Sequence, residues 1–139
     1  MLMKHFLKVC LLSLFVSIPL TSLQAEEIDV QETILKAQNN DKQGLYQLAY
    51  LKQMGEAGVK KNIPEAIELY KRASALGHRS ANHNLGLIYY RGDSVAVDYV
   101  ESAKWFEIAS ERKLEDSQRI LLSMYYKELI PKNKNKMEQ

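Results

Sequence analysis

The chain has 139 residues, of which 46% are hydrophobic and 26% are charged, with 19 basic and 17 acidic side chains and a single cysteine. A chain of this length is enough for one domain that buries roughly two thirds of its unfolded surface. One cysteine excludes an intramolecular disulfide framework, and the small charge excess gives little basis for general binding to nucleic acid.

The first 25 residues are predicted to be a secretory signal peptide. Lys4 and Lys8 precede an apolar run over residues 9–20, and small residues then lead to Ala25. This is the order of regions in a cleavable signal, and the run is shorter than the roughly 20 residues of a membrane-spanning helix. We expect cleavage after Ala25 and a periplasmic or secreted protein; an uncleaved anchor helix is the alternative.

Cleavage would change the charge and the thiol content of the chain. Residues 1–25 hold two of the 19 basic residues, none of the 17 acidic residues, and Cys10, the only cysteine. The remaining chain therefore has equal numbers of both charges and no thiol. We expect no nucleic-acid partner, no stable membrane insertion after cleavage, and stability that comes from packing alone.

A repeat of 36 or 37 residues runs through the rest of the chain. Residues 48–77 align with residues 85–113, and a third, partial copy begins at Ser117. The matching pairs are Leu48 with Leu85, Gly55 with Gly92, Val59 with Val95, Asn62 with Asp98, Glu65 with Glu101, Leu69 with Trp105, Tyr70 with Phe106, and Ala73 with Ala109; in the third copy Leu121, Tyr125 and Tyr126 match Leu85, Tyr89 and Tyr90. This self-similarity predicts like units stacked in a row.

Each copy is predicted to be a helix, a turn and a second helix. Apolar residues of the first segment recur at helical spacing, and Gly55 or Gly92 follows the last of them, where a left-handed cap favours glycine. Asn62 and Asp98 each precede a glutamate by three residues, a variant of the capping box that predicts helix starts. Small residues of the second helices mark close approaches of neighbouring helices: Ala66, Ala73, Ser102 and Ala109.

We expect about six helices. The predicted units are a lone helix over residues 28–39, repeats over residues 43–77 and 80–113, a partial repeat over residues 116–130, and a disordered tail over residues 131–139. Together the helical units form one repeat domain over residues 26–130. Six helices give three stacked pairs, which is about the minimum for a stable array.

The second copy carries a recognisable pattern: Ala81, Leu85, Gly86, Tyr89, Gly92, Val95, Asp98, Ser102, Trp105, Phe106 and Ala109. It resembles the Sel1-like repeat, a relative of the tetratricopeptide repeat, over roughly residues 37–127. Four positions depart from the pattern: Lys52, Ser94, Lys113 and Glu128. The resemblance implies an all-α, right-handed solenoid that acts as an adaptor and binds other proteins.

No motif of the chain indicates catalysis or metal binding. His78 and His83 are five residues apart and do not share a helical face as an i, i+4 zinc pair would. The segment GEAGVKK lacks the spacing of a phosphate-binding loop, and no Gly-x-Ser-x-Gly elbow occurs. We therefore expect no enzyme, no cofactor and no metal.

The resemblance also implies a binding surface, because the first helix of each tetratricopeptide-like pair lines a concave face. Transfer of the groove positions predicts these partner-binding residues: Tyr46, Tyr50, Gln53, His83, Leu87, Tyr90, Arg91, Arg119, Tyr126 and Lys127. Tyrosine and arginine often anchor interfaces. A protein segment with an acidic side chain or a C-terminal carboxylate would suit the three cations. The alternative is that the tyrosines fill the core and the cations form a solvated face.

Three functions fit these expectations. The first is an exported envelope adaptor that binds a protein or peptide. The second is a periplasmic immunity or inhibitor protein that neutralises a toxin or an enzyme. The third, hydrolysis of β-lactams or of the cell wall, rests on family association alone.

The tripeptide Arg91-Gly92-Asp93 matches the motif of cell-adhesion ligands. Gly55 recurs at Gly92 one repeat later, so the end of a helix explains this glycine without a receptor. We interpret the tripeptide as a polar turn.

Overall fold

The structure is a computed structural model that describes residues 29–131. Within this range the chain forms six helices and no strand: α1 (Val30–Gln38), α2 (Lys42–Met54), α3 (Ile63–Ala75), α4 (Arg79–Arg91), α5 (Tyr99–Glu111) and α6 (Glu115–Tyr126). The predicted all-α solenoid of six helices is confirmed. The predicted signal peptide and residues 132–139 of the predicted tail lie outside the described residues.

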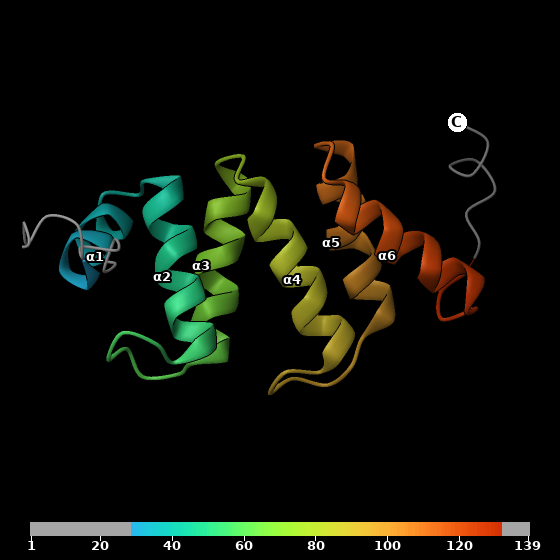
Figure 1. The fold of residues 1–139 in the computed structure, drawn as a ribbon, viewed down its shortest axis with the longest axis horizontal. Helices are drawn as coiled ribbons and strands as arrows, with labels where there is room; N and C mark the ends of the chain where they lie inside the picture. Colours follow the sequence, from blue (N-terminus) through green and yellow to red (C-terminus); the bar gives the residue numbers. More distant parts are fainter. Residues whose placement is uncertain (1–28, 132–139) are drawn as a thin grey trace, which may run out of the picture.

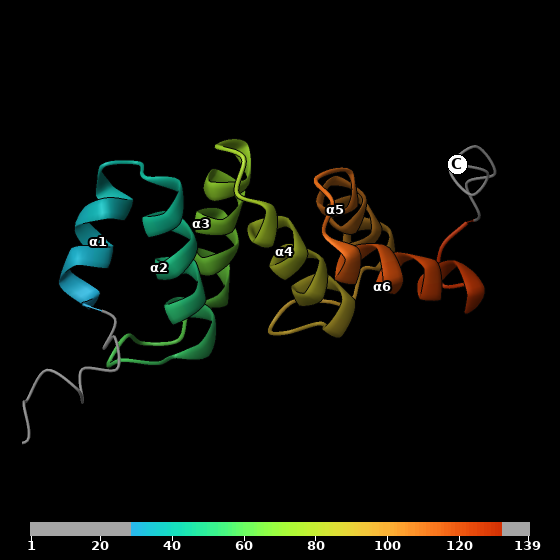
Figure 2. The same cartoon turned by 45° about the horizontal axis from the view of Figure 1, so that its top comes forward.

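The helices follow one another along the long axis of the molecule (Figures 1 and 2). Each helix packs mainly on its neighbours in sequence. In Figure 1, α2, α4 and α6 lie toward the viewer, and α3 and α5 lie behind them. The first helices of the three copies therefore share one side of the array, which we name the first-helix face. None of the described helices has the length and apolar character needed to cross a membrane.

Capping side chains begin the second helices, as predicted. Oδ1 of Asn62 accepts a hydrogen bond from the backbone N–H of Glu65 at 3.1 Å, and Oδ1 of Asp98 accepts one from the N–H of Glu101 at 2.8 Å. Nδ2 of Asn62 also donates to Oε2 of Glu65 at 3.1 Å, so the two side chains are bonded to each other, whereas the backbone N–H of Asn62 donates to the carbonyl of Lys52. The two bonds to the Oδ1 atoms of Asn62 and Asp98 satisfy backbone N–H groups that the first turn of a helix leaves unpaired.

Gly92 ends α4 in the left-handed conformation, with φ of 74°. Its N–H donates to the carbonyl of Ile88 at 3.0 Å, and the N–H of Asp93 donates to the same carbonyl at 3.2 Å. Gly55 ends α2 in the same way, with φ of 75°. The tripeptide Arg91-Gly92-Asp93 is therefore a helix end that the repeat requires, as predicted.

The backbone of the repeat persists where its glycines are replaced. Lys113 takes the position of Gly77 and keeps a positive φ, 62° against 88°. Glu128, with φ of 56°, takes the position of Gly92. Ser94, with φ of 57°, takes the position of Gly58. The departures from the repeat pattern thus leave the turns in place, at an energetic cost to each L-residue.

Two clusters of buried side chains form the core. One joins α1 to α4 around Leu45, Tyr70 and Leu85, and the other joins α5 to α6 around Phe106 and Met124. The small residues that predicted close helix contacts are all fully buried: Ala66, Ala73, Ser102 and Ala109. The core therefore follows the repeat and leaves the exposed faces of the first helices available for other contacts.

Candidate functional site

Side chains of α4 and α6 surround an open hollow of about 360 Å³, which we name the α4–α6 hollow. The lining residues are His83, Leu87 and Arg91 from α4, and Asp116, Arg119, Ile120 and Ser123 from α6. Four of the predicted partner-binding residues therefore come together: His83, Leu87, Arg91 and Arg119. They come from two successive repeats, at the helix positions that the repeat register predicted.

His83 fixes the two walls of the hollow relative to each other. Its Nδ1 lies 2.8 Å from Oγ of Ser117 on α6, and its ring meets the ring of Phe106 edge-on at a centroid distance of 5.6 Å. Burial lowers the pKa of His83, Arg91 lowers it further, and Asp116 opposes both. The imidazole is therefore a neutral hydrogen-bonding group at pH 7, and the positive charge of the hollow comes from arginine.

The rim of the hollow is cationic and its wall is partly apolar. Arg91 is exposed and makes no ion pair within residues 29–131. Arg119 pairs with Asp116, one turn earlier on α6. Leu87 and Ile120, which are half-buried, pack against the second core cluster. This arrangement can receive a hydrophobic side chain beside a carboxylate that pairs with Arg91.

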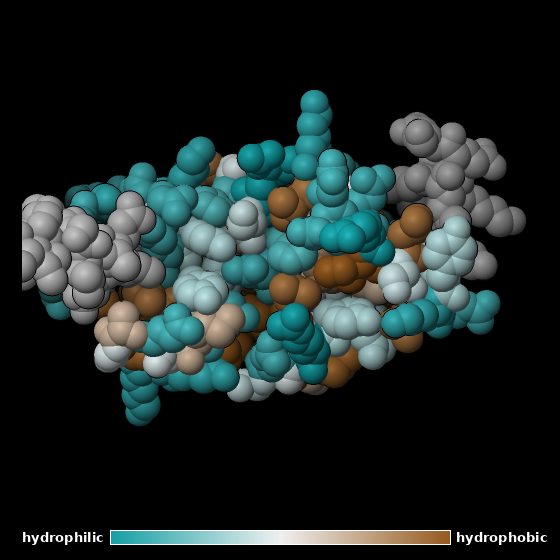
Figure 3. Space-filling view, viewed as in Figure 1, coloured by the Kyte–Doolittle hydropathy of each residue, from teal (hydrophilic) through white to brown (hydrophobic). Residues whose placement is uncertain are grey.

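This part of the first-helix face is also mixed in character in Figure 3. Apolar patches lie over the region of α4 and α6, and hydrophilic side chains surround them. Isolated apolar residues are ordinary on a protein surface. In the α4–α6 hollow, Leu87 and Ile120 line the same space as Arg91 and Arg119, and apolar residues with arginine are typical of interfaces.

The predicted residues of α2 form a separate, largely internal cluster. The ring of Tyr46 stacks on that of His78 at a centroid distance of 4.1 Å and packs against the first core cluster. Gln53 is only 7% exposed, and its Oε1 accepts a hydrogen bond from Oη of Tyr70 at 2.8 Å. Nδ2 of Asn84 donates to the same hydroxyl at 2.9 Å. Gln53 therefore serves packing in this structure, whereas Tyr46 and its half-buried neighbour Tyr50 border the first-helix face.

The remaining predicted residues are Tyr90 near the end of α4, and Tyr126 and Lys127 at the end of α6. Tyr90 is half-buried and meets Tyr99 edge-on at a centroid distance of 5.6 Å. Tyr126 is 70% exposed, and Lys127 is exposed beside it. None of these three lines the α4–α6 hollow. The predicted surface is thus divided into the α2 cluster, the hollow, Tyr90 against α5, and the exposed pair Tyr126 and Lys127 at the end of α6.

Ile120 lines the hollow but was not among the predicted residues. Its equivalent one repeat earlier is Asn84, whose side chain turns inward to Tyr70. The repeat alignment alone therefore gave no reason to expect Ile120 in the α4–α6 hollow. Its apolar character next to Arg119 was the only signal in the sequence.

The site offers binding groups and no reactive constellation. Within residues 29–131, no group of three or more His, Cys, Asp and Glu side chains could hold a metal ion. The hollow supplies cations, hydroxyl and imidazole groups, and apolar surface. These are groups that can form hydrogen bonds, ion pairs and apolar contacts with a ligand.

Comparison with known proteins gives a family for this architecture. The model of the Sel1 repeat matches residues 42–78 and 79–114. Similar solved structures include a protective antigen present in uropathogenic Escherichia coli strains that displays an SLR fold, with 26% identity, a TM-score of 0.67, and coverage of 72% of this chain and 21% of that chain. A Sel1 repeat protein from Oxalobacter formigenes has 28% identity, a TM-score of 0.66, and coverage of 69% and 39%.

This chain thus spans less than half the length of either of these two proteins. No curated protein sequence matched it. The two matched repeats follow each other without a gap and cover more than half of the 139 residues, and they contain both complete helix pairs, α2 with α3 and α4 with α5. The chain therefore belongs to the Sel1 repeat family.

Proposed function

We propose that this protein is an exported, non-catalytic adaptor of the cell envelope that binds an extended segment of another protein on its first-helix face. Sel1 repeat proteins are generally protein-interaction modules, and their fold is typically a non-catalytic scaffold. Export is supported by the order of charged, apolar and small residues in residues 1–25. The binding role has its main support in the α4–α6 hollow.

The composition of the hollow indicates the chemistry of the bound segment. Leu87 and Ile120 offer apolar contact, and Arg91 offers a guanidinium that no ion pair within residues 29–131 occupies. A carboxylate held by arginine forms a charge-assisted hydrogen bond, which is stronger than one between neutral groups. The segment proposed therefore carries a hydrophobic side chain next to an acidic side chain or a C-terminal carboxylate.

A hollow of about 360 Å³ accommodates only a few side chains and is an anchor rather than a whole interface. Stable protein interfaces bury about 800 Å² on each partner. The rest of the contact would lie along the first-helix face, past Tyr50 and Tyr46 toward α2. We expect most of the binding energy to come from contacts with Arg91 and Arg119, since a few residues dominate most interfaces and arginine is frequent among them.

Photo-crosslinking in living cells tests both parts of the proposal. A photoreactive phenylalanine replaces Leu87 or Ser123 in the hollow, and Glu68, which is exposed on α3, as the matched control. We expect the same protein to be crosslinked from Leu87 and from Ser123 but not from Glu68. The crosslinked complex should be found in the envelope fraction, and the purified chain should begin at Glu26. Equal crosslinking from Glu68 would contradict the surface, and recovery of the intact chain from the cytoplasm would contradict export.

A further inference from the structure

Two grooves of the structure occupy the same position of the repeat. The α1–α2 groove, of about 560 Å³, is lined by Val30, Ile34 and Lys52, among others. The α5–α6 groove, of about 420 Å³, is lined by residues that stand two repeat lengths later: Ala103 corresponds to Val30, Glu107 to Ile34, and Tyr125 to Lys52. The repeat register thus gives both grooves the same two helical walls.

The α1–α2 groove has a third wall, which is the next helix in the chain. α3 contributes Glu65, Leu69 and Arg72 to its lining. The backbone N–H of Asn62 donates to the carbonyl of Lys52 at 2.7 Å, and Nζ of Lys52 lies 3.0 Å from Oε2 of Glu65. These contacts hold α3 against the groove.

The same closure recurs one repeat later, where α5 covers α3 and α4. The N–H of Asp98 donates to the carbonyl of Tyr89 at 3.0 Å, as that of Asn62 does to Lys52. Trp105, the equivalent of Leu69, packs against the first core cluster. Glu101, the equivalent of Glu65, accepts a hydrogen bond from Nε1 of Trp105. The pKa of Lys71 is raised chiefly by its hydrogen bond to Glu68, and the charge of Glu101 adds to this from across the helix contact. The helix that follows is therefore the regular third wall.

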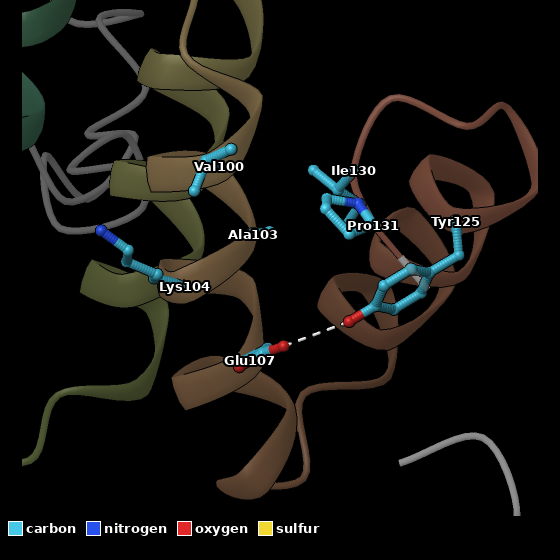
Figure 4. Close-up of a pocket in the computed structure, with 7 residues that line it drawn as sticks. All are labelled: Val100, Ala103, Lys104, Glu107, Tyr125, Ile130 and Pro131. Carbon is cyan, nitrogen blue, oxygen red and sulfur yellow. Dashed lines mark hydrogen bonds between the residues drawn. The ribbon is translucent and has the colours of Figure 1, made fainter. Parts of the chain in front are cut away.

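The α5–α6 groove has no such helical wall within residues 29–131. Figure 4 shows Val100, Ala103 and Glu107 of α5 on one side and Tyr125, Ile130 and Pro131 on the other, with the Tyr125 hydroxyl bonded to Glu107 across the inner end. Val100 remains 55% exposed. Ile130, which lines the groove after α6, is buried in the second core cluster.

Two more side chains of α6 are exposed where their equivalents are covered by the next helix. Leu122 is 44% exposed, whereas its equivalent Gly86 is buried directly under Phe106 of α5. Tyr126 is 70% exposed, whereas its equivalent Tyr90 meets Tyr99 of α5. The groove, Leu122 and Tyr126 therefore mark out one surface that matches the contact surface of a second helix.

We infer that this surface binds an amphipathic helix of a partner protein, which packs against α6 as α5 packs against α4. The surface is separate from the α4–α6 hollow and would extend the array with a helix from another chain. Helices that lay an apolar face into a groove are a common mode of recognition.

The surface also specifies the sequence of that helix. At the position of Glu101, the helix would face Glu107, which stands where α3 has Lys71, so a basic residue suits this position. Four residues later, at the position of Trp105, a large apolar side chain would enter the groove. At the next position, that of Phe106, a small residue is required, because Leu122 fills the space that Gly86 leaves for the ring.

A peptide of residues 97–112 provides the probe, because α5 closes the equivalent groove in the same chain. Val100 is replaced by glutamate, and a lactam between this side chain and Lys104 keeps the peptide helical, since both positions are exposed in α5. The variant peptide with Glu101→Lys and Phe106→Ala carries the inferred pattern, and the unchanged peptide is its control. Both are titrated into the isotopically labelled full chain and followed by amide chemical shifts.

We expect the variant peptide to bind at least about tenfold more tightly than the unchanged one. The amide chemical shifts of Ala103, Leu122 and Tyr125 should change on binding. Equal affinities, shifts confined to other residues, or no binding by either peptide would overturn it. So would a dimer of this chain that Leu122→Asp dissociates, because a second copy would then be the occupant. Binding that appears only after deletion of residues 132–139 would assign the surface to the chain's own tail and overturn it too.

Compensating substitutions in the protein distinguish specific recognition of the peptide from non-specific hydrophobic binding. Leu122→Gly recreates the space found at Gly86, and should favour peptides that retain Phe106 over those with alanine. Glu107→Lys should reverse the preference at position 101 from lysine to glutamate. Circular dichroism of both variants checks that the fold is retained. A preference that neither substitution changes would contradict the inferred register of the helix.

Discussion

Nδ1 of His83 on α4 lies 2.8 Å from the hydroxyl oxygen of Ser117 on α6, and this contact joins the second repeat to the third. Ser117 is fully buried, and the imidazole also lies against Phe106. The bond therefore sets the distance between the two walls of the α4–α6 hollow. A neutral imidazole suits this place, because a charged one would lose part of its hydration.

Acidification is expected to destabilise the protein between about pH 7 and about pH 5, because the pKa values of both described histidines are lowered by burial. The unfolded chain takes up protons near pH 6.5, the ordinary value, whereas the folded chain takes them up only at lower pH. Below pH 6.5 the unfolded state thus binds more protons, and the free energy of unfolding falls. Urea titrations at several pH values across this range measure the slope of the free energy of unfolding against pH.

The histidines themselves can be tested as the source of that slope. His83→Gln should flatten it, and His78→Gln/His83→Gln should flatten it further, since glutamine retains hydrogen-bonding capacity without titrating. An unchanged slope in the double variant, or greater stability at low pH, would contradict this assignment.

Tyr70→Phe is expected to lower the free energy of unfolding by about 1–3 kcal/mol, since it leaves buried polar groups without a partner. The hydroxyl joins Gln53 of α2 to Asn84 of α4 and thereby links two repeats. A double-mutant cycle with Gln53→Met, followed by urea denaturation, measures the coupling. Strict additivity of the two substitutions would show that the Tyr70–Gln53 bond contributes nothing.

Gly86→Ala is expected to destabilise by about 1–3 kcal/mol through overpacking, although alanine favours a helix interior by about 1 kcal/mol over glycine. A Cβ at this position would lie 2.7 Å from Cε1 of Phe106, which is fully buried. Thermal unfolding measures whether the substitution lowers or raises the stability of the protein overall. The second change Phe106→Leu should relieve part of the loss, and a stabilised single variant would contradict the close contact.

Lys113→Gly is expected to stabilise by about 0.5–1 kcal/mol, because lysine holds a left-handed conformation that costs an L-residue about 1–2 kcal/mol. Its φ is 62°, and Gly77 is the residue at the same position of the previous repeat. Lys113→Ala serves as the control, since alanine keeps the conformational cost. Equal stabilisation by both substitutions, measured in urea, would assign the effect to the lost charge.

Local features of the fold could be predicted from the sequence because their causes are local. Gly55 and Gly92 end helices through their own backbone freedom, and Asn62 and Asp98 begin helices by bonding three residues ahead. Each of these signals recurs at the repeat spacing. The repeat therefore gave the helices, their order and their core-facing positions.

The binding surface was predicted only in part, because the exposure of a side chain depends on what the next helix places over it. Gln53 and Tyr126 hold the same repeat position, yet one is 7% and the other 70% exposed. The difference comes from Tyr70, which reaches Gln53 from α3, whereas no helix follows α6 within the described range. Such neighbours across the array are not visible in the periodicity of one segment.

The central claim, that a partner segment binds at the α4–α6 hollow through Arg91, is tested most directly by its affinity for charge-reversed protein. The partner identified by crosslinking is titrated calorimetrically against the unmodified chain, Arg91→Glu/Arg119→Glu, and the control Lys60→Glu/Lys61→Glu, whose lysines are exposed in the turn before α3. We predict a loss of at least about tenfold in affinity for the arginine variant, and no change for the control. Unchanged affinity of the arginine variant would contradict the account.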